Sequence, residues 1–228
     1  MSAKIIFVTG TDTGVGKTLL TALLLQHLRL NGVRALAMKP FCSGGRADVN
    51  LLQSLQPGEL SDAEMNPFYF PEPVAPLVSE KMRRKTIRLK EVLARIQSIK
   101  AKCETLLIEG SGGLLVPLGR GFTVADLIAQ LDCQVVVAAR NRLGTINHTL
   151  LTIGALREIG QVPRTVVLMG CAKADVSSRT NRETLTELLR PMRVFEVPFL
   201  GNNCLIPAAV KRNVGKVKNA LNFVTQKT

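Results

Sequence analysis

Histidine and cysteine, the side chains that usually bind zinc, are scarce in this sequence. It holds two histidines, His27 and His148, and five cysteines that lie far apart without any Cys-x-x-Cys pair. A structural zinc site needs four such ligands, usually at short spacing, so the composition argues against one. The cysteines are expected to be reduced, buried thiols of a cytoplasmic protein.

Long apolar runs are missing as well, although hydrophobic residues make up 46% of the chain. Runs such as 5–8 and 135–139 are far shorter than the roughly 20 residues that cross a bilayer. Thr9, Gly10 and Asp12 end the first apolar run before the core of a signal peptide could form. We therefore expect a soluble cytoplasmic protein that does not act on membranes.

Acidic residues are few, with 17 Asp and Glu against 30 Lys and Arg and a net charge of +13. Such a charge attracts polyanions at long range. The densest basic stretch, residues 81–90, has no aromatic side chains interleaved for stacking on bases. We interpret it as a solvated face and expect no nucleic-acid partner.

Short apolar runs alternate with stretches of helical period. Strands are expected at 4–9, 33–38, 104–108, 134–139, 164–169 and 193–197. Helices are expected at 17–31, 48–55, 87–101, 123–131, 145–159, 179–190 and 207–224. Continuous apolar strands have both faces covered, so this order predicts a doubly wound α/β fold with a mostly parallel sheet.

Length and even composition indicate one domain that spans residues 1–228. Only the segment 56–80 breaks the alternation of strands and helices. Its five prolines predict an irregular excursion, which could line a substrate site.

The strongest local motif is GTDTGVGKT at 10–18, between a predicted strand and a predicted helix. Glycines let the backbone turn its N–H groups toward a phosphate, and the helix N-terminus adds positive charge. Lys17 is placed to reach the β- and γ-phosphates, and Thr18 offers a hydroxyl to Mg²⁺. Thr11 stands where the simplest phosphate-loop pattern has its first glycine, yet the Lys-Thr pair still predicts nucleotide binding.

A phosphate loop needs carboxylates to hold its metal, and the candidates are Asp48 and Glu109, with Asp62 as a weaker rival. Glu109 ends a predicted strand, at the sheet edge where ligands of open α/β folds bind. Asp48 has an alternative interpretation as a helix N-cap. Lys39 ends the second strand before Pro40, which would bring a second ammonium to the same edge and stabilise a transferring phosphoryl group.

Several segments in order together resemble the dethiobiotin synthetase family. They are VTGTDTGVGKT (8–18), KPFCSGG (39–45), NPFYFPEPVAP (66–76), IEGSGGLLVPL (108–118), TVADLIAQ (123–130) and RLGTINHTLLT (142–152). The similarity runs from residue 5 to about 200, and the combination is far more specific than the phosphate loop alone. It implies a P-loop NTPase architecture.

The resemblance also implies the reaction. An amine of 7,8-diaminopelargonate takes up CO₂ as a carbamate, ATP phosphorylates the carbamate, and the second amine closes the ureido ring and expels phosphate. Mg²⁺ is the implied cofactor and ATP a co-substrate. The enzyme is expected to be a homodimer whose partner subunit holds the substrate's carboxylate tail.

The resemblance assigns roles to individual residues. The catalytic residues are Lys39 and Lys17, and the metal ligands are Thr18, Asp48 and Glu109. The nucleotide-binding residues are Gly14, Val15, Gly16, Lys17, Thr18, Leu19, Glu109, Gly110, Met169, Gly170, Pro198, Phe199 and Leu200. The substrate-binding residues are Thr13, Lys39, Ser43, Thr145, Ile146 and Asn147, with Arg142 adding charge nearby.

The main departure from the family lies at Met169 and Gly170, where relatives often have an asparagine that recognises the base. Methionine cannot supply paired hydrogen bonds, which leaves the base preference open. Some relatives also carry glutamate in place of Gly14.

The alternative function is a partition- or division-type ATPase that acts on DNA or membranes, which the net charge favours. Its loop should contain a second lysine at position 12, where this chain has Asp12. An amidating synthetase of the cobyrinate type would need a further glutamine amidotransferase domain. A non-catalytic nucleotide-binding module would make Lys39 and both carboxylates incidental.

Overall fold

A central sheet of six parallel strands organises the molecule, with strand order β10-β9-β8-β1-β5-β2. The computed structural model describes residues 3–84 and 86–226. The strands of the sheet are β1 (Lys4–Gly10), β2 (Ala35–Met38), β5 (Thr105–Glu109), β8 (Gln134–Arg140), β9 (Thr165–Met169) and β10 (Arg193–Val197). In the register, Phe7 of β1 pairs with Ile108 on one side and with Val135 on the other.

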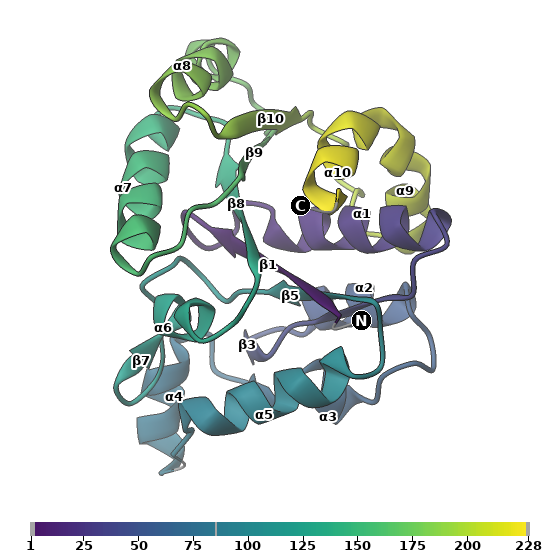
Figure 1. Cartoon of the computed structure of the whole chain (residues 1–228), viewed down its shortest axis with the longest axis vertical. Coiled ribbons are helices and arrows are strands. Elements are labelled where there is room, and N and C mark those ends of the chain that lie inside the picture. The colour runs from purple at the N-terminus through teal and green to yellow at the C-terminus, as the bar shows by residue number, and fades with distance from the viewer. Residues whose placement is uncertain (1–2, 85, 227–228) are drawn as a thin grey trace.

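Helices cover both faces of this sheet. Helices α1 (Lys17–Leu30), α9 (Pro207–Asn213) and α10 (Lys218–Thr225) lie on one side, and α6 (Val124–Ala129) and α7 (Thr145–Glu158) lie on the other (Figure 1). Because both faces are covered, the central strands β1, β5 and β8 are buried along almost their whole length. The predicted doubly wound α/β fold is confirmed.

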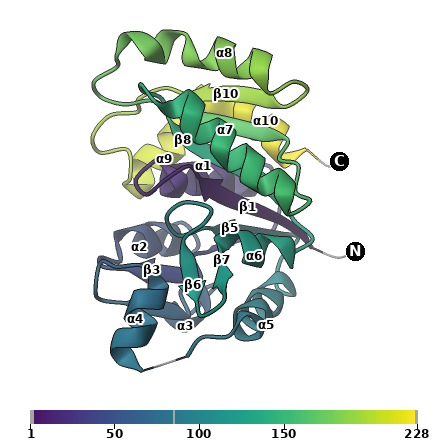
Figure 2. The same ribbon diagram turned by 90° about the vertical axis from the view of Figure 1, so that its left-hand side faces the viewer.

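Most of the remaining elements lie in the lower half of the molecule in Figure 2, and the others lie around β10 and α1. They are α2 (Ala47–Ser54), α3 (Asp62–Met65), α4 (Pro76–Arg83), α5 (Leu89–Lys100), α8 (Asn181–Leu188), the parallel pair β3 (Phe41–Ser43) and β4 (Phe68–Phe70), the hairpin β6 (Pro117–Gly119) and β7 (Phe122–Thr123), and the 3₁₀ turns η1 (Val176–Arg179) and η2 (Val214–Val217). The buried apolar residues form one continuous cluster.

Two expectations about elements were wrong. The segment 56–80 is not irregular: it contains α3, β4 and the start of α4. Ser61 and Glu64 form a capping box that starts α3, and Pro76 occupies the first turn of α4, where its missing N–H costs nothing. The single helix expected at 207–224 is broken by the 3₁₀ turn η2, which contains the poor helix former Gly215.

The basic stretch 81–90 straddles the end of α4 and the start of α5, and Lys85 within it lies outside the described residues. Arg83 of this stretch pairs with Glu72, with 2.8 Å between Nη2 and Oε1. No helix among the described residues has the length and apolarity that crossing a bilayer requires.

The order of the strands determines where a ligand can bind. The chain leaves β1 toward β2 on one side and returns through β5 to β8 on the other, so the direction of winding reverses beside β1. A crevice at the carboxyl ends of the strands is expected at such a reversal. The residues that end β1, β5 and β8 there are Gly10, Glu109 and Arg140.

Candidate functional site

The loop between β1 and α1 depends on glycine for its shape. Gly14 and Gly16 have φ values of 69° and 103°, a left-handed backbone that other residues rarely adopt. Gly16 is also the N-cap of α1, and a Cβ there would lie 2.9 Å from Cγ of Met169. The glycines therefore allow both the tight turn and the close packing of the loop on β9.

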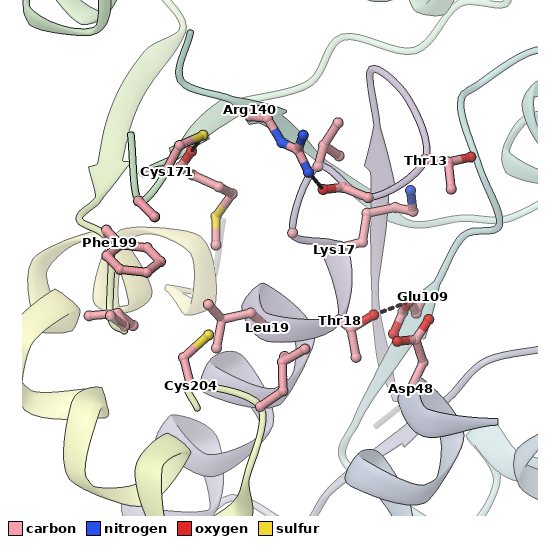
Figure 3. A pocket seen from close by; sticks show the side chains of 18 of the residues that line it. Thr13, Lys17, Thr18, Leu19, Asp48, Glu109, Arg140, Cys171, Phe199 and Cys204 are labelled. Atoms are coloured by element: carbon pink, nitrogen blue, oxygen red, sulfur yellow. Dashed lines mark hydrogen bonds between the residues drawn. The ribbon is translucent and has the colours of Figure 1, made fainter. Parts of the chain in front are cut away.

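A cavity of about 590 Å³ opens beside this loop, at the carboxyl ends of the strands. Figure 3 shows Thr18, Asp48 and Glu109 at one end of it and Cys171, Phe199 and Cys204 at the other. Predicted residues that line it are Thr13, Gly14, Val15, Gly16, Lys17, Thr18, Leu19, Lys39, Asp48, Glu109, Met169, Gly170, Pro198, Phe199 and Leu200. The fold thus brings together residues that are spread over most of the sequence.

Lys17 is a buried cation at the start of α1. Its Nζ donates to the carbonyl oxygen of Asp12 at 2.8 Å. Burial lowers the pKa of Lys17 to about 8, because the nearby carboxylate of Glu109 only partly offsets the loss of solvation, and the ammonium of Lys39 lowers it further. An anionic ligand in this cavity would raise the pKa of Lys17 back toward its ordinary value.

Lys39 forms the most concentrated charge cluster of the site. Its Nζ lies 2.5 Å from Oδ2 of Asp48 and 2.5 Å from Oε1 of Glu109. Thr18 donates its hydroxyl to the same Glu109 oxygen at 2.8 Å. Burial would lower the pKa of Lys39, but the two carboxylates outweigh it and raise that pKa above its ordinary value.

The neighbourhood of Lys39 decides between the candidate acids. Asp62 bonds instead to Arg46 and Gln53 at the surface, so Asp48 is the aspartate at the cavity. Asp48 is not an N-cap either: α2 begins at Ala47, which places Asp48 in the first turn of the helix. Asn66 donates to the carbonyl oxygen of Lys39 at 2.8 Å and so positions the lysine backbone.

The carboxylate end of the cavity suits a hard divalent cation. Within the described part of the chain, Oε2 of Glu109 has no hydrogen-bond partner although it is buried. No group of three or more His, Cys, Asp or Glu residues among the described residues could hold a metal by itself. Mg²⁺ is typically held by one or two carboxylates together with phosphate oxygens and water, which matches Asp48, Glu109 and the Thr18 hydroxyl.

Some predicted residues lie outside the large cavity. Gly110 packs under β1, where its N–H donates to the carbonyl oxygen of Val8 at 2.9 Å. Ser43 ends β3 and is half-buried. Thr145 lines a second cavity of about 20 Å³ on the other side of the loop, whereas Ile146 and Asn147 are not among the described residues that line either cavity. The predicted substrate-binding roles of Ile146 and Asn147 would therefore need contacts from a second molecule.

The end of the cavity that faces β9 and β10 is apolar. Here Cys171, Ala172, Cys204 and Leu205 join Met169 and Phe199, and sequence patterns did not indicate these four residues. Gly170 is required because a Cβ at this position would lie 2.5 Å from the backbone nitrogen of Phe199. The sequence predicted buried thiols, but Cys171 and Cys204 are half-buried rather than fully buried, and no local motif surrounds them.

Arg140 was also missed in the sequence. It ends β8, lines both cavities and donates from Nη2 to the carbonyl oxygen of Gly14 at 2.6 Å. The one signal that could have found it is its position at the end of a predicted parallel strand, the same signal that indicated Glu109 and Lys39.

The chain matches a family model described as an AAA domain over residues 4–202. Similar curated relatives include the ATP-dependent dethiobiotin synthetase BioD of Bacillus licheniformis, 38% identical over 200 residues that cover 86% of this chain and 83% of the relative. The enzyme of that name from Bacillus subtilis is 35% identical over 224 residues, covering 95% and 94%. That of Methanococcus vannielii is 42% identical over 155 residues, covering 68% and 74%.

Several solved structures have a similar fold. The MinC:MinD cell division complex of Aquifex aeolicus gives a TM-score of 0.63 at 14% identity, covering 96% of both chains. A ParA family ATPase from Chlorobium tepidum gives 0.60 at 12% identity, covering 99% of both chains. At such low identity the likeness concerns the fold alone.

Proposed function

The chain belongs to the ATP-dependent dethiobiotin synthetase family, and on that basis we propose how its residues bind ATP, Mg²⁺ and the diamine that becomes dethiobiotin. It is a ligase that uses ATP to form carbon–nitrogen bonds in biotin biosynthesis. The substrates are 7,8-diaminopelargonate, CO₂ and ATP. The observation that carries the proposal is the convergence of Lys17, Lys39, Asp48 and Glu109 on one cavity.

The reaction needs positioning and charge rather than a protein nucleophile. One amine adds to CO₂ and loses a proton, which gives a carbamate. A carbamate oxygen attacks the γ-phosphorus of ATP and ADP leaves. The second amine then attacks the carbonyl carbon, and the C–O bond to phosphate breaks as the ring closes, releasing phosphate and a proton.

Lys39 is the residue that we place at the reacting atoms. Its ammonium is buried, charged and located beside the phosphate loop, where it can neutralise the carbamate and the transferring phosphoryl group. Lys17 lines the same cavity and binds the β- and γ-phosphates of ATP. Two ammonium groups beside the transferring group stabilise the charge that spreads over its oxygens.

Thr18, Asp48 and Glu109 would hold Mg²⁺. The unpartnered oxygen of Glu109 and the hydroxyl of Thr18 supply hard oxygen ligands at the same end of the cavity. Bound Mg²⁺ would neutralise part of the negative charge of the phosphates. The residues' own contribution is to keep the cation and Lys39 on the same side of the phosphate loop.

A homodimer would complete the substrate site. The helix α7 begins at Thr145, and the N–H groups of Ile146 and Asn147 in its first turn have no partner within the helix, which suits a carboxylate. The cavity beside this helix is only about 20 Å³, too small to enclose an aliphatic chain. Leu143 and Leu151 on this surface are 79% and 64% exposed, which supports contact with a second subunit.

Thr13 and Ser43 are assigned to the diamine and carbamate, and Met169, Gly170, Pro198, Phe199 and Leu200 to the base.

All five cysteines are free within the described chain, which supports a reducing, cytoplasmic location.

The direct test is turnover. Purified protein with Mg²⁺, bicarbonate and 7,8-diaminopelargonate is expected to release phosphate and form the cyclic urea, with ATP, GTP and CTP compared in parallel. Each reaction is repeated without the diamine and with added DNA. Phosphate release that ignores the diamine but rises with DNA would replace this function with the partition-type alternative.

The role of Lys39 is tested by Lys39→Ala, which should abolish turnover and leave nucleotide binding largely intact. Lys90→Ala serves as the matched control, because Lys90 is exposed on α5 and lines neither of the two cavities. A fully active Lys39→Ala enzyme would remove this residue from the mechanism.

A further inference from the structure

Arg140 borders both of the cavities described above. It is the last residue of β8, and it lines the large cavity on one side and the small cavity on the other. Its side chain is exposed, and Nη2 donates to the carbonyl oxygen of Gly14 at 2.6 Å, as the dashed line in Figure 3 shows. An exposed arginine that bonds to the middle of a phosphate loop calls for a physical explanation.

The geometry of the peptide bond supplies one. The carbonyl of Gly14 and the N–H of Val15 belong to the same planar trans peptide, so they point in opposite directions. Fixing the carbonyl oxygen on the Arg140 side therefore fixes the direction of the Val15 N–H. Within the described residues that N–H has no hydrogen-bond partner in the protein, and Val15 lines the large cavity.

Gly14 makes such a restraint useful. With φ of 69° and no side chain, it can rotate its following peptide at little cost. The neighbouring Val15 side chain is 5% exposed and packed into the core, so it anchors one end of the peptide but not the orientation of the carbonyl. A hydrogen bond from a charged donor is stronger than one between neutral groups, so it can select one orientation of this peptide.

We propose that Arg140 is a positioning residue for nucleotide binding, which holds the Gly14–Val15 peptide so that the Val15 N–H faces the phosphates. The inference rests on the proposed binding of ATP at this loop. The proposed role affects the affinity for ATP rather than the rate of phosphoryl transfer, because Arg140 acts through the loop and not on the transferring group.

The test compares Arg140→Met, which removes every donor from a similar stem, with Arg140→Lys, which keeps a charged donor. Binding of a non-hydrolysable ATP analogue with Mg²⁺ is measured by calorimetry at low and high salt. We expect Arg140→Met to raise Kd roughly tenfold, the equivalent of about 1.4 kcal/mol, and Arg140→Lys to recover most of it. In turnover, KM for ATP should rise while kcat stays within about twofold.

Arg157→Met is the matched control, because Arg157 is exposed near the far end of α7 and lines neither of the two cavities. Thermal melts check that the variants fold, and the amide exchange of Val15 by NMR reports the loop directly: it should change in Arg140→Met and return toward wild type in Arg140→Lys.

Two results would overturn the proposal. One is a wild-type Kd in Arg140→Met. The other is a loss that disappears at high salt, which would assign Arg140 a direct, screened attraction to phosphate instead. Wild-type turnover, measured separately, tells a failure of this inference from a failure of the proposed function.

Discussion

The buried ammonium of Lys17 carries a cost in the nucleotide-free protein. Its pKa of about 8 lies below the value of 10.5 for an exposed lysine. Between these two pH values the unfolded chain binds more protons than the folded one, so stability rises with pH across the window. Below about pH 8 the full cost of the buried charge is present.

Lys17→Met should therefore stabilise the nucleotide-free protein at pH 7, by on the order of 2 kcal/mol. The gain should shrink as pH rises from about 8 toward 10, because wild type then loses the charge. Urea unfolding of both proteins at several pH values measures the difference. A variant less stable than wild type at pH 7 would contradict the assigned cost.

Lys39 is the cation that neutralises Asp48 and Glu109 in this structure. Replacing it by methionine would leave Glu109, 1% exposed at its side chain, without a counter-charge, at a cost of about 3–5 kcal/mol. A divalent cation could then supply the missing charge.

Lys39→Met is accordingly expected to bind Mn²⁺ without nucleotide, whereas wild type binds it far more weakly. Electron paramagnetic resonance measures free Mn²⁺, and Mn²⁺ should raise the melting temperature of the variant alone. Lys17→Met is the control, since Lys17 donates to the backbone carbonyl oxygen of Asp12 rather than to a carboxylate. Equal Mn²⁺ binding by wild type and Lys39→Met would refute the expectation.

At the scale of elements, the approach of β9 to the loop after β10 decides the shape of the apolar end of the cavity. Gly170→Ala would place a methyl group 2.5 Å from the nitrogen of Phe199 and push that loop outward. We expect ATP affinity to fall about tenfold or more, with a loss of stability of about 1–3 kcal/mol.

Gly215→Ala is the contrasting variant. It lies in η2 with open space around its Cβ position and no positive φ. Replacing it should leave ATP binding unchanged and stabilise the fold by about 0.5–1 kcal/mol. Calorimetric titration and thermal unfolding of both variants make the comparison; similar losses in the two would show that packing at Gly170 is not specific.

Five of the six strands were predictable because each is a short, largely buried apolar run between segments of helical period. The edge strand β10 is buried only at Val194 and Val197. The segment 56–80 was not predictable in this way. Its prolines suggested irregular chain, but Pro76 starts a helix, and Phe68 and Phe70 alternate with exposed Tyr69 in a strand that pairs with β3. The partner strand lies far away in sequence, so local signals could not indicate it.

At the scale of the whole molecule, the proposed homodimer would complete the substrate site. Leu151→Arg should convert the proposed dimer to a monomer, because a charge at an apolar contact that the dimer would bury costs several kcal/mol. Sedimentation velocity measures the change, and turnover should fall while ATP binding remains. A variant that stays dimeric would remove this face of α7 from the interface.

Local sequence was sufficient for the phosphate loop, since strand, glycines, lysine and helix are contiguous within residues 4–30. It also restricted the partners of the loop to residues at strand ends. Only the tertiary structure decides which of these residues meet. Thr18 and Glu109 are 91 positions apart in the sequence, and Arg140 and Gly14 are 126 positions apart. Asp48 rather than Asp62 faces Lys39 because α2 begins at Ala47 and turns its first carboxylate inward. Contacts of this kind depend on the order of strands in the sheet, and no nearby residue pattern encodes that order.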